Sequence, residues 1–261
     1  MKYSIIGCGF IYPRHKESIE KIGGEVILTC DIDPKKEADF LDYKEMFKSP
    51  KFKEVDVVVI CTPNYLHAQM SRDAIDLGKK VLCEKPLTID KDFSGLEDVN
   101  VVLQLRYHDM IGAIKDALRD SNNIELVMRV CRDDKWWKSW RGNYGQSGGI
   151  LLGIAIHMFD FLIFLLGNEY QIIDSKHSIK KCFGTIEFPD AQVNYNVEIL
   201  DFDDKEHQTR KFIINGKEFE LCNKDNLSFA GYHDQVHKEF AAGRGITLDE
   251  ARKSIELVLK L

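Results

Sequence analysis

The segment "KYSIIGCGFIYPRH", residues 2–15, joins an apolar run to a glycine turn and then to the start of a helical pattern. The run "KYSII" has the length and composition of a buried strand. Gly7 and Gly9 follow it, and glycine allows the tight turn that leads from a strand into a helix. We therefore predict a strand–turn–helix unit, which is how a parallel sheet covered by helices begins.

The same alternation continues through the first 105 residues. The later apolar runs are continuous, as expected for strands that are buried on both faces of a parallel sheet. The predicted strands are residues 2–7, 25–33, 55–65, 79–87 and 100–107, with a turn and helix within 8–24 and a helix at 66–78. This pattern predicts an α/β domain of the doubly covered, parallel type over residues 1–105.

The second half of the chain has a different pattern, in which polar and apolar residues alternate. The segment "IINGKEF", residues 213–219, contains an Asn-Gly pair, which is a strong hairpin signal. The predicted strands are residues 124–134, 177–189, 191–200, 209–216 and 217–222, and the predicted helices are 108–118, 150–166, 231–242 and 247–260. We predict an α+β domain over residues 106–261 with a mainly antiparallel, open sheet.

Charge and cysteine content exclude several classes of protein. The formal net charge of −6 gives no general attraction to nucleic acid or to an anionic membrane. The seven cysteines form no CxxC pair and no cluster with histidine, so we expect reduced thiols, a cytoplasmic protein and no metal site. The apolar segment 148–167 has the length of a membrane span, but His157 and Asp160 lie within it, and we expect a buried helix instead.

Asp31 ends the second predicted strand, 24 residues after Gly7. A carboxylate there can accept hydrogen bonds from the adenosine ribose, and its charge would repel a 2′-phosphate, so the pattern favours NAD over NADP. Alternatively, Asp31 only caps a turn. The third glycine of the dinucleotide-binding pattern is absent, and Tyr12 stands in its place.

Two motifs lie at the carboxyl ends of the third and fourth predicted strands, "CTPNYLH" at 61–67 and "CEKPL" at 83–87. Ligands bind at the carboxyl ends of the strands in an open parallel sheet. Pro86 holds the chain next to Lys85 in an extended form, which restricts the position of that lysine. Most lysines are solvated surface groups, but one at this edge of the sheet is a candidate for function.

These motifs, with "GCGFI" and "GGILLGIAIHMFD", resemble the Gfo/Idh/MocA family of NAD(P)-dependent sugar and inositol oxidoreductases. The resemblance implies a Rossmann domain and a C-terminal α/β domain whose open sheet forms a homodimer or homotetramer. The segments "PRH", "PNYLH", "LQLRYHDMI", "KSWRG" and "AGRGITLDEAR" are similar to the branch that oxidises UDP-N-acetylglucosaminuronic acid at C3 for bacterial surface polysaccharides. Two departures stand out: Gly153 replaces a polar family residue, and residues 31–55 and 88–99 are short, which predicts reduced helices.

The motifs and the resemblance together predict the site residues. The catalytic pair is Lys85 and His157, in which the imidazole is the base and the ammonium stabilises the alkoxide. The predicted cofactor-binding residues are Gly7, Gly9, Phe10, Ile11, Asp31, Thr62, Pro63, Asn64, His67, Glu84 and Lys85. The predicted substrate-binding residues are Arg106, His108, Lys138, Ser139, Trp140, Arg141 and His157. Alternatively, His157 is a core histidine, and His67 and Arg14 cap helices.

The segment "RDDKWWKSWRG", residues 132–142, offers cations for a diphosphate or a carboxylate. It also contains all three tryptophans, whose rings suit either a uracil base or a subunit contact. Asp160 is interpreted as a helix cap or as part of an interdomain salt bridge.

Three functions remain open: an NAD-dependent dehydrogenase of a nucleotide-sugar uronate, a dehydrogenase of another sugar or inositol, and a non-catalytic NAD-binding regulator.

Overall fold

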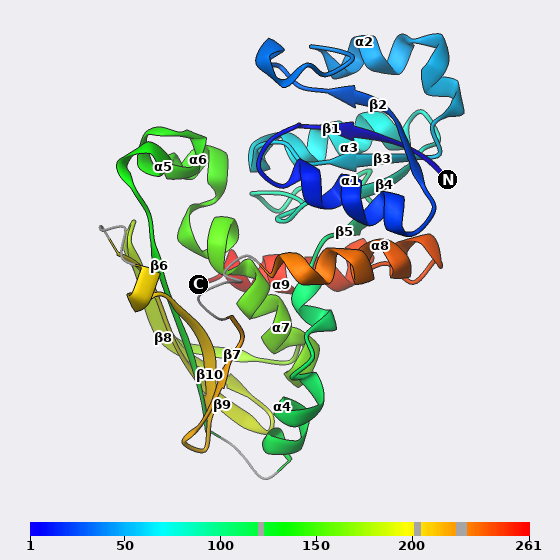
Figure 1. The fold of residues 1–261 in the computed structure, drawn as a ribbon. Coiled ribbons are helices and arrows are strands. Elements are labelled where there is room, and N and C mark those ends of the chain that lie inside the picture. The colour runs from blue at the N-terminus through cyan, green and yellow to red at the C-terminus, as the bar shows by residue number, and fades with distance from the viewer. Residues whose placement is uncertain (120–122, 201–204, 223–228) are drawn as a thin grey trace. The chain divides into compact units, whose positions relative to one another are not determined.

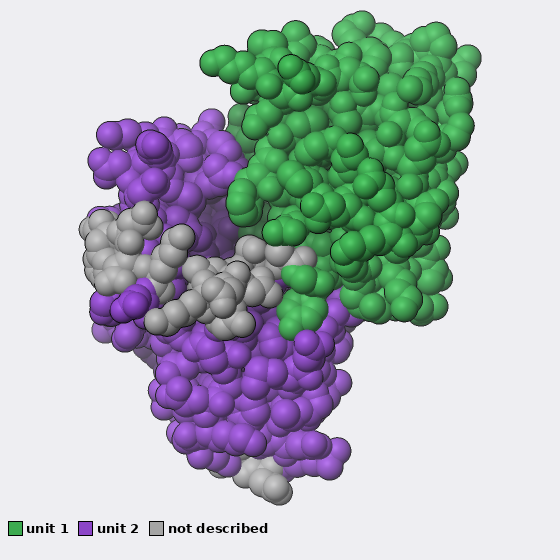
Figure 2. Space-filling model, viewed as in Figure 1, with its two compact units in different colours: residues 1–103, 231–252 green, residues 104–230, 253–261 purple. Residues whose placement is uncertain are grey.

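The computed structural model describes residues 1–119, 123–200, 205–222 and 229–261. The chain forms two compact units, which Figure 2 colours separately. Unit 1 contains residues 1–103 and 231–252, and unit 2 contains residues 104–230 and 253–261. The predicted division after residue 105 therefore differs from the structure at residues 231–252, which pack with the N-terminal unit.

Unit 1 is built on a five-stranded parallel sheet in the order β2-β1-β3-β4-β5 (Figure 1). Its strands are β1 (Lys2–Ile6), β2 (Glu25–Cys30), β3 (Val57–Ile60), β4 (Lys80–Cys83) and β5 (Val99–Val101). Its helices are α1 (Tyr12–Lys21), α2 (Tyr43–Lys48), α3 (His67–Ile75) and α8 (His233–Ala241). Every residue of β3 is buried, as the continuous apolar run predicts for a central parallel strand. The predicted parallel sheet is confirmed.

The two short connections in unit 1 have reduced helices, as predicted. Between β2 and β3 the only α-helix is α2, which has six residues. Residues 88–98, all of them described, contain no helix.

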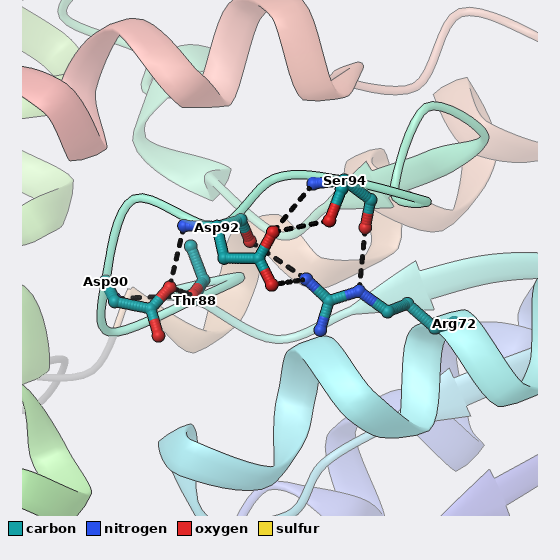
Figure 3. A network of polar contacts seen from close by, with 5 residues as sticks. All are labelled: Arg72, Thr88, Asp90, Asp92 and Ser94. Carbon is teal, nitrogen blue, oxygen red and sulfur yellow. Dashed lines mark hydrogen bonds and ion pairs between the residues drawn. The ribbon is translucent and has the colours of Figure 1, made fainter.

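Side chains hold the connection after β4 in place of a helix (Figure 3). Arg72 on α3 donates hydrogen bonds to the main-chain carbonyls of Ser94 at 2.7 Å and Asp92 at 3.0 Å, and to the Asp92 carboxylate at 2.8 Å. Asp90 accepts from the Thr88 hydroxyl and from the Asp92 main-chain N–H, both at 2.8 Å. One guanidinium thus fastens the loop to the neighbouring helix.

Unit 2 contains a six-stranded sheet in the order β11-β10-β6-β9-β8-β7. Its strands are β6 (Asn123–Cys131), β7 (Gln171–His177), β8 (Lys181–Phe188), β9 (Ala191–Leu200), β10 (Thr209–Ile214) and β11 (Lys217–Glu220). All neighbours are antiparallel except β6 and β9, which confirms the mainly antiparallel sheet. The predicted hairpin is also confirmed, since Asn215 and Gly216 have φ angles of 49° and 77° between β10 and β11.

The helices of unit 2 include the apolar segment. They are α4 (Ile111–Leu118), α5 (Asp134–Lys138), α6 (Tyr144–Ser147) and α7 (Ile156–Leu166), and α9 (Leu248–Val258) spans the boundary between the units. Within the described residues, the segment Tyr144–Leu166 is the one helical stretch long and apolar enough to cross a membrane, and 67% of its apolar window is buried. Helix α7 packs on the sheet of unit 2, where Phe159 contacts Tyr195 and Phe161 contacts Phe212. This packing agrees with the expected buried helix.

Strand β7 was not predicted. It is an edge strand, and none of its residues is fully buried. Its sequence therefore lacks the apolar periodicity that identifies the other strands.

We predict that Arg72→Ala lowers the free energy of unfolding by about 1–3 kcal/mol, because it removes a charge-assisted hydrogen bond and two bonds to carbonyls. Urea denaturation measures the change. Arg72→Lys should recover only part of it, since an ammonium lacks the planar fork of a guanidinium. Arg119→Ala is the control, because Arg119 is exposed and contacts only Asp116 among the described residues. Equal effects of Arg72→Ala and Arg119→Ala would contradict the prediction.

Candidate functional site

The glycine turn after β1 combines a tight contact with an open space. Gly7 has a φ of +96°, and a Cβ atom there would lie 2.6 Å from the main-chain oxygen of Cys61. A Cβ atom at Gly9 would meet nothing within 4 Å. Gly7 therefore allows the turn to pack against the end of β3, and Gly9 leaves the main chain open to a close-lying ligand. This arrangement fits a pyrophosphate beside the amino end of α1.

Asp31 links the glycine turn to the end of β2. One carboxylate oxygen accepts a hydrogen bond from the Cys8 main-chain N–H at 2.7 Å, and the other accepts from the Asp33 N–H at 2.9 Å. A carboxylate oxygen can accept more than one bond, so Asp31 can cap this turn and also receive ribose hydroxyls. Its two interpretations are thus compatible.

Two exposed apolar side chains lie at the same edge of the sheet. Phe10 follows β1 and is 81% exposed, and Ile32 follows β2 and is 86% exposed. Because β1 and β2 are parallel neighbours, their carboxyl ends lie at one edge. Apolar groups there suit the faces of an adenine ring. Sequence reasoning missed Ile32, although its position directly after the acidic residue was a usable signal.

We predicted that His67 binds the cofactor, but the structure places its side chain in the interior of unit 1. It is buried, and its ring nitrogens lie 2.8 Å from the carbonyl oxygens of Pro86 and Thr62. The imidazole therefore joins the turn after β3 to the turn after β4. Burial lowers the pKa of His67, and the two carbonyls oppose that shift. Arg14 is exposed and pairs with Glu17 at 3.5 Å.

Glu84, also predicted to bind cofactor, directs its carboxylate to histidines inside unit 1. Its Oε1 lies 3.0 Å from His15 Nε2 and 3.5 Å from His233 Nε2. Burial opposes ionisation, but the two histidines outweigh it and hold the pKa of Glu84 well below its usual range. The Lys85 main-chain N–H donates to the other carboxylate oxygen at 3.3 Å. Lys85 itself is partly exposed.

His157 lies in the first turn of α7, in unit 2. It is 7% exposed, and its ring meets that of Phe229 edge-on, with centroids 6.0 Å apart. A π-helical turn, Leu151–Ala155, directly precedes α7 and contains Gly153. Such turns are frequent at functional sites. Gly153, the departure from the family pattern, thus lies within a local distortion of the helix.

Arg106 and His108 are part of the interior of unit 2 and not an open substrate surface. Arg106 forms a two-bond ion pair with Asp160, at 2.9 Å and 2.7 Å, and both side chains are buried. His108 accepts from the Met110 main-chain N–H and faces the Leu221 carbonyl at 3.0 Å. The structure thus gives both residues structural partners. Asp160 is part of a salt bridge as one interpretation held, but its partner lies within its own unit.

Three arginines gather in unit 2 near the tryptophan-rich segment. Burial, with the nearby charges of Arg210 and Arg141, lowers the pKa of Arg132 to about 10. None of the three forms an ion pair with a carboxylate in the described part of the chain. Cations that repel one another at a partly buried place are suited to bind an anion. Sequence reasoning missed Arg210, because it lies on β10, far along the chain.

The tryptophan-rich segment forms a compact loop that contains the short helix α5 and a 3₁₀ turn at Trp140–Gly142. Arg132 lies over the ring of Trp136 at 5.7 Å, and Arg141 lies over that of Trp140 at 4.7 Å. Ser139 caps the turn that follows by accepting from the Arg141 main-chain N–H. Lys138 is exposed and lies 3.6 Å from Asp134. The loop thus holds Arg132 and Arg141 against aromatic rings, and Lys138 lies at its surface.

Comparison with known proteins gives two family matches. Residues 1–105 match the model of the Gfo/Idh/MocA oxidoreductase family described as its NAD-binding Rossmann fold. Residues 123–239 match the model of the C-terminal alpha/beta domain of the same family.

Individual relatives point to two kinds of dehydrogenase. The inositol 2-dehydrogenase of Salmonella paratyphi B is 32% identical over 66% of this chain and 56% of that protein. The WlbA (WbpB) dehydrogenase of Thermus thermophilus, solved with NAD and α-ketoglutarate, has a TM-score of 0.85 and 27% identity over 98% of this chain and 92% of that one. The same enzyme solved with NAD and UDP-GlcNAcA has a TM-score of 0.83 and 26% identity over 99% and 93%. The chain spans about half the length of the curated relatives it matches.

The two glycines of the turn should respond differently to the same substitution. We predict that Gly7→Ala destabilises the protein, since its Cβ would collide with the Cys61 carbonyl at a positive φ. Gly9→Ala should leave the melting temperature nearly unchanged and weaken NAD binding about tenfold or more, since its Cβ enters the ligand space. Thermal unfolding and NAD titration measure the two effects. Unchanged NAD affinity in Gly9→Ala would contradict this account of the turn.

Stability should fall as the pH is lowered below about 6.5. His15 and His237 are buried, and burial lowers the pKa of both, that of His237 to about 2. Only the unfolded chain takes up protons at these residues, so each one removes about 1.4 kcal/mol per pH unit below pH 6.5. The stabilisation from Glu84, whose folded pKa is depressed, is lost only at lower pH.

Urea denaturation between about pH 5 and pH 7 tests this dependence. In His237→Gln, which cannot titrate, the slope of stability against pH should fall by about one proton. A stability that does not change over this range would contradict the prediction.

Proposed function

Because the chain belongs to the Gfo/Idh/MocA oxidoreductase family, we propose that it is an NAD-dependent dehydrogenase of a UDP-linked N-acetylglucosaminuronate, oxidising the C3 hydroxyl to a ketone. The observation that carries the substrate class is the group of Arg132, Arg141 and Arg210 in unit 2. A nucleotide-sugar uronate brings a diphosphate and a carboxylate, and these anions match three cations that have no carboxylate partner in the described residues. The structures solved with NAD and UDP-GlcNAcA support the same class.

The residues of unit 1 fit NAD. The turn at Gly7 and Gly9 would hold the pyrophosphate, Asp31 would accept the ribose hydroxyls, and Phe10 and Ile32 would flank the adenine. When bound, NAD supplies a hydride acceptor at C4 of its nicotinamide. The charge of Asp31 would repel a 2′-phosphate, which favours NAD over NADP.

Two side chains of the protein would take part in the reaction. His157 accepts the proton of the C3 hydroxyl as the hydride leaves the same carbon, so the alcohol loses two electrons and two hydrogens in total. The Lys85 ammonium donates a hydrogen bond to the developing alkoxide and stabilises its charge. Lys85 belongs to unit 1 and His157 to unit 2.

The unit 2 loop would bind the remainder of the substrate. Arg132 and Arg141 would face the diphosphate or the carboxylate, and the ring of Trp136 or Trp140 would stack on the uracil base. The buried ion pair between Arg106 and Asp160 would support the helix that carries His157.

A second candidate is a dehydrogenase of inositol or of an uncharged sugar, which the inositol 2-dehydrogenases among the relatives favour. An uncharged substrate carries no anionic group that could pair with the three arginines. We therefore prefer the anionic nucleotide-sugar uronate as the substrate. All seven cysteines are free, and we propose that the protein works in the reducing cytoplasm, as a homodimer or homotetramer.

Turnover with a substrate panel tests the proposal. Purified protein and NAD are mixed with UDP-N-acetylglucosaminuronate, UDP-N-acetylglucosamine, free glucuronate or myo-inositol, and NADH formation is followed by absorbance. We expect turnover with the UDP-linked uronate only. Turnover with myo-inositol alone would support the second candidate and contradict the first.

Variants of the protein, assayed with the same substrates, test the roles assigned to individual residues. Lys85→Ala and His157→Ala should each lower kcat by about 10²–10⁴-fold. His157→Ala should still bind NAD as the wild type does. Arg210→Gln should mainly raise the KM of the uronate.

A further inference from the structure

Four side chains that the reaction does not use directly meet inside unit 1. We name His15, Glu84, His233 and His237 the Glu84 cluster. His15 comes from α1, Glu84 follows β4, and the other two lie one turn apart on α8. All four are buried, and His15 and His237 are fully so. The return of α8 to unit 1 therefore brings two imidazoles to the residue that precedes Lys85 in the chain.

The hydrogen bonds of the cluster define where its protons lie. His15 Nε2 is 3.0 Å from a Glu84 oxygen, and His15 Nδ1 is 2.9 Å from His237 Nε2. An ionised carboxylate only accepts, so His15 must carry its proton on Nε2. A neutral His15 then accepts at Nδ1, and His237 donates from Nε2. This chain of two donated protons ends on Glu84.

The environment supports this assignment. Burial lowers the pKa of His15 and of His237, which keeps both rings neutral, and the pKa of Glu84 is held well below its usual range. His237 Nδ1 has no hydrogen-bond partner among the described residues. In the proposed tautomer this atom is an unpaired acceptor and not an unpaired N–H, and a buried unpaired N–H is the less tolerated of the two.

The same atoms have the spacing of a metal site. One ligand atom each from His15, Glu84 and His233 lie within 4.8 Å of one another. A metal would take the lone pair of His15 Nε2 and force the proton to Nδ1, so His15 would donate to His237. His237 would then carry a buried N–H at Nδ1 without an acceptor among the described residues, which is costly. The hydrogen-bonded form is therefore the better account.

We propose that His15, supported by His237 and His233, is a positioning residue that keeps Glu84 an anion and thereby holds the main chain at Lys85. The link is the hydrogen bond from the Lys85 N–H to the second oxygen of Glu84. Its consequence for catalysis rests on the proposed function, in which the Lys85 ammonium stabilises the alkoxide. Lys85 is thus held through its main chain.

Other titratable groups face Glu84 and enter the test. His67 from α3 and the thiols of Cys61 and Cys83 interact with its charge. Asp234 of α8 contacts Ser18 at 2.6 Å and Lys21 at 2.7 Å, both on α1. Asp234 therefore joins α1 to α8 without contacting Glu84, which makes it a matched control.

Nuclear magnetic resonance of the ¹⁵N-labelled full chain tests the cluster without any turnover. We expect His15 and His237 to be protonated only at Nε2 between about pH 6 and pH 8. The Lys85 amide signal should not titrate in the wild type. In His15→Leu the buried carboxylate loses its donor and becomes protonated more easily, so the Lys85 signal should titrate with a midpoint above about pH 6.

Two variants separate positioning from simple packing. His15→Gln supplies an N–H near the place of Nε2 and should suppress the titration. Asp234→Ala should leave the Lys85 signal as in the wild type. The proposal is overturned if Asp234→Ala shifts it as much as His15→Leu does, if His15 carries its proton on Nδ1, or if elemental analysis finds one bound metal per chain that His15→Leu lacks.

Kinetics then test the consequence for the reaction. With the UDP-linked uronate, His15→Leu should lower kcat about tenfold to a hundredfold at low pH, with recovery at high pH and little change in KM. His15→Gln and Asp234→Ala should keep the wild-type pH profile. A wild-type protein that oxidises no member of the panel contradicts the proposed function, whereas the tautomers and the Lys85 titration still decide the role of the cluster.

Discussion

A side chain at position 7 would lie 2.6 Å from the carbonyl oxygen of Cys61, so β1 and β3 can end side by side only with glycine there. This close approach places the turn after β1, the acid after β2 and the motif after β3 at one edge of the sheet. The Cys8 N–H, next to Gly7, then reaches Asp31. The ligand edge of unit 1 thus depends on a position where no Cβ fits.

Features that depend on neighbouring residues were predictable from the sequence. Gly7 and the Asn215–Gly216 hairpin need positive φ angles, which short motifs reveal. The buried strands of unit 1 are continuous apolar runs, and the shortened connections follow from counting residues. Edge strand β7 had no such signal, because solvent and not a core surrounds most of its side chains.

Features that depend on distant partners were not predictable. Arg106, His108 and His67 are polar residues in promising motifs, yet each is bonded inside its own unit. Their local sequence does not distinguish a side chain that binds a ligand from one that is already bonded to Asp160 or to a main-chain carbonyl. The amphipathic pattern of residues 231–242 predicts a helix, but not that this helix packs on α1 in unit 1. Arg210 likewise joins Arg132 only through the pairing of β10 with β6.

The return of α8 to unit 1 has a consequence for the order in which the protein is made. All five strands of the parallel sheet have left the ribosome once residue 101 has emerged. The partners of His15 on α8, however, are synthesised some 130 residues later, at 233 and 237. During that interval a carboxylate and an imidazole destined for the interior stay hydrated. The unit that begins first is therefore completed almost last, when residues 104–230 of unit 2 have already been translated.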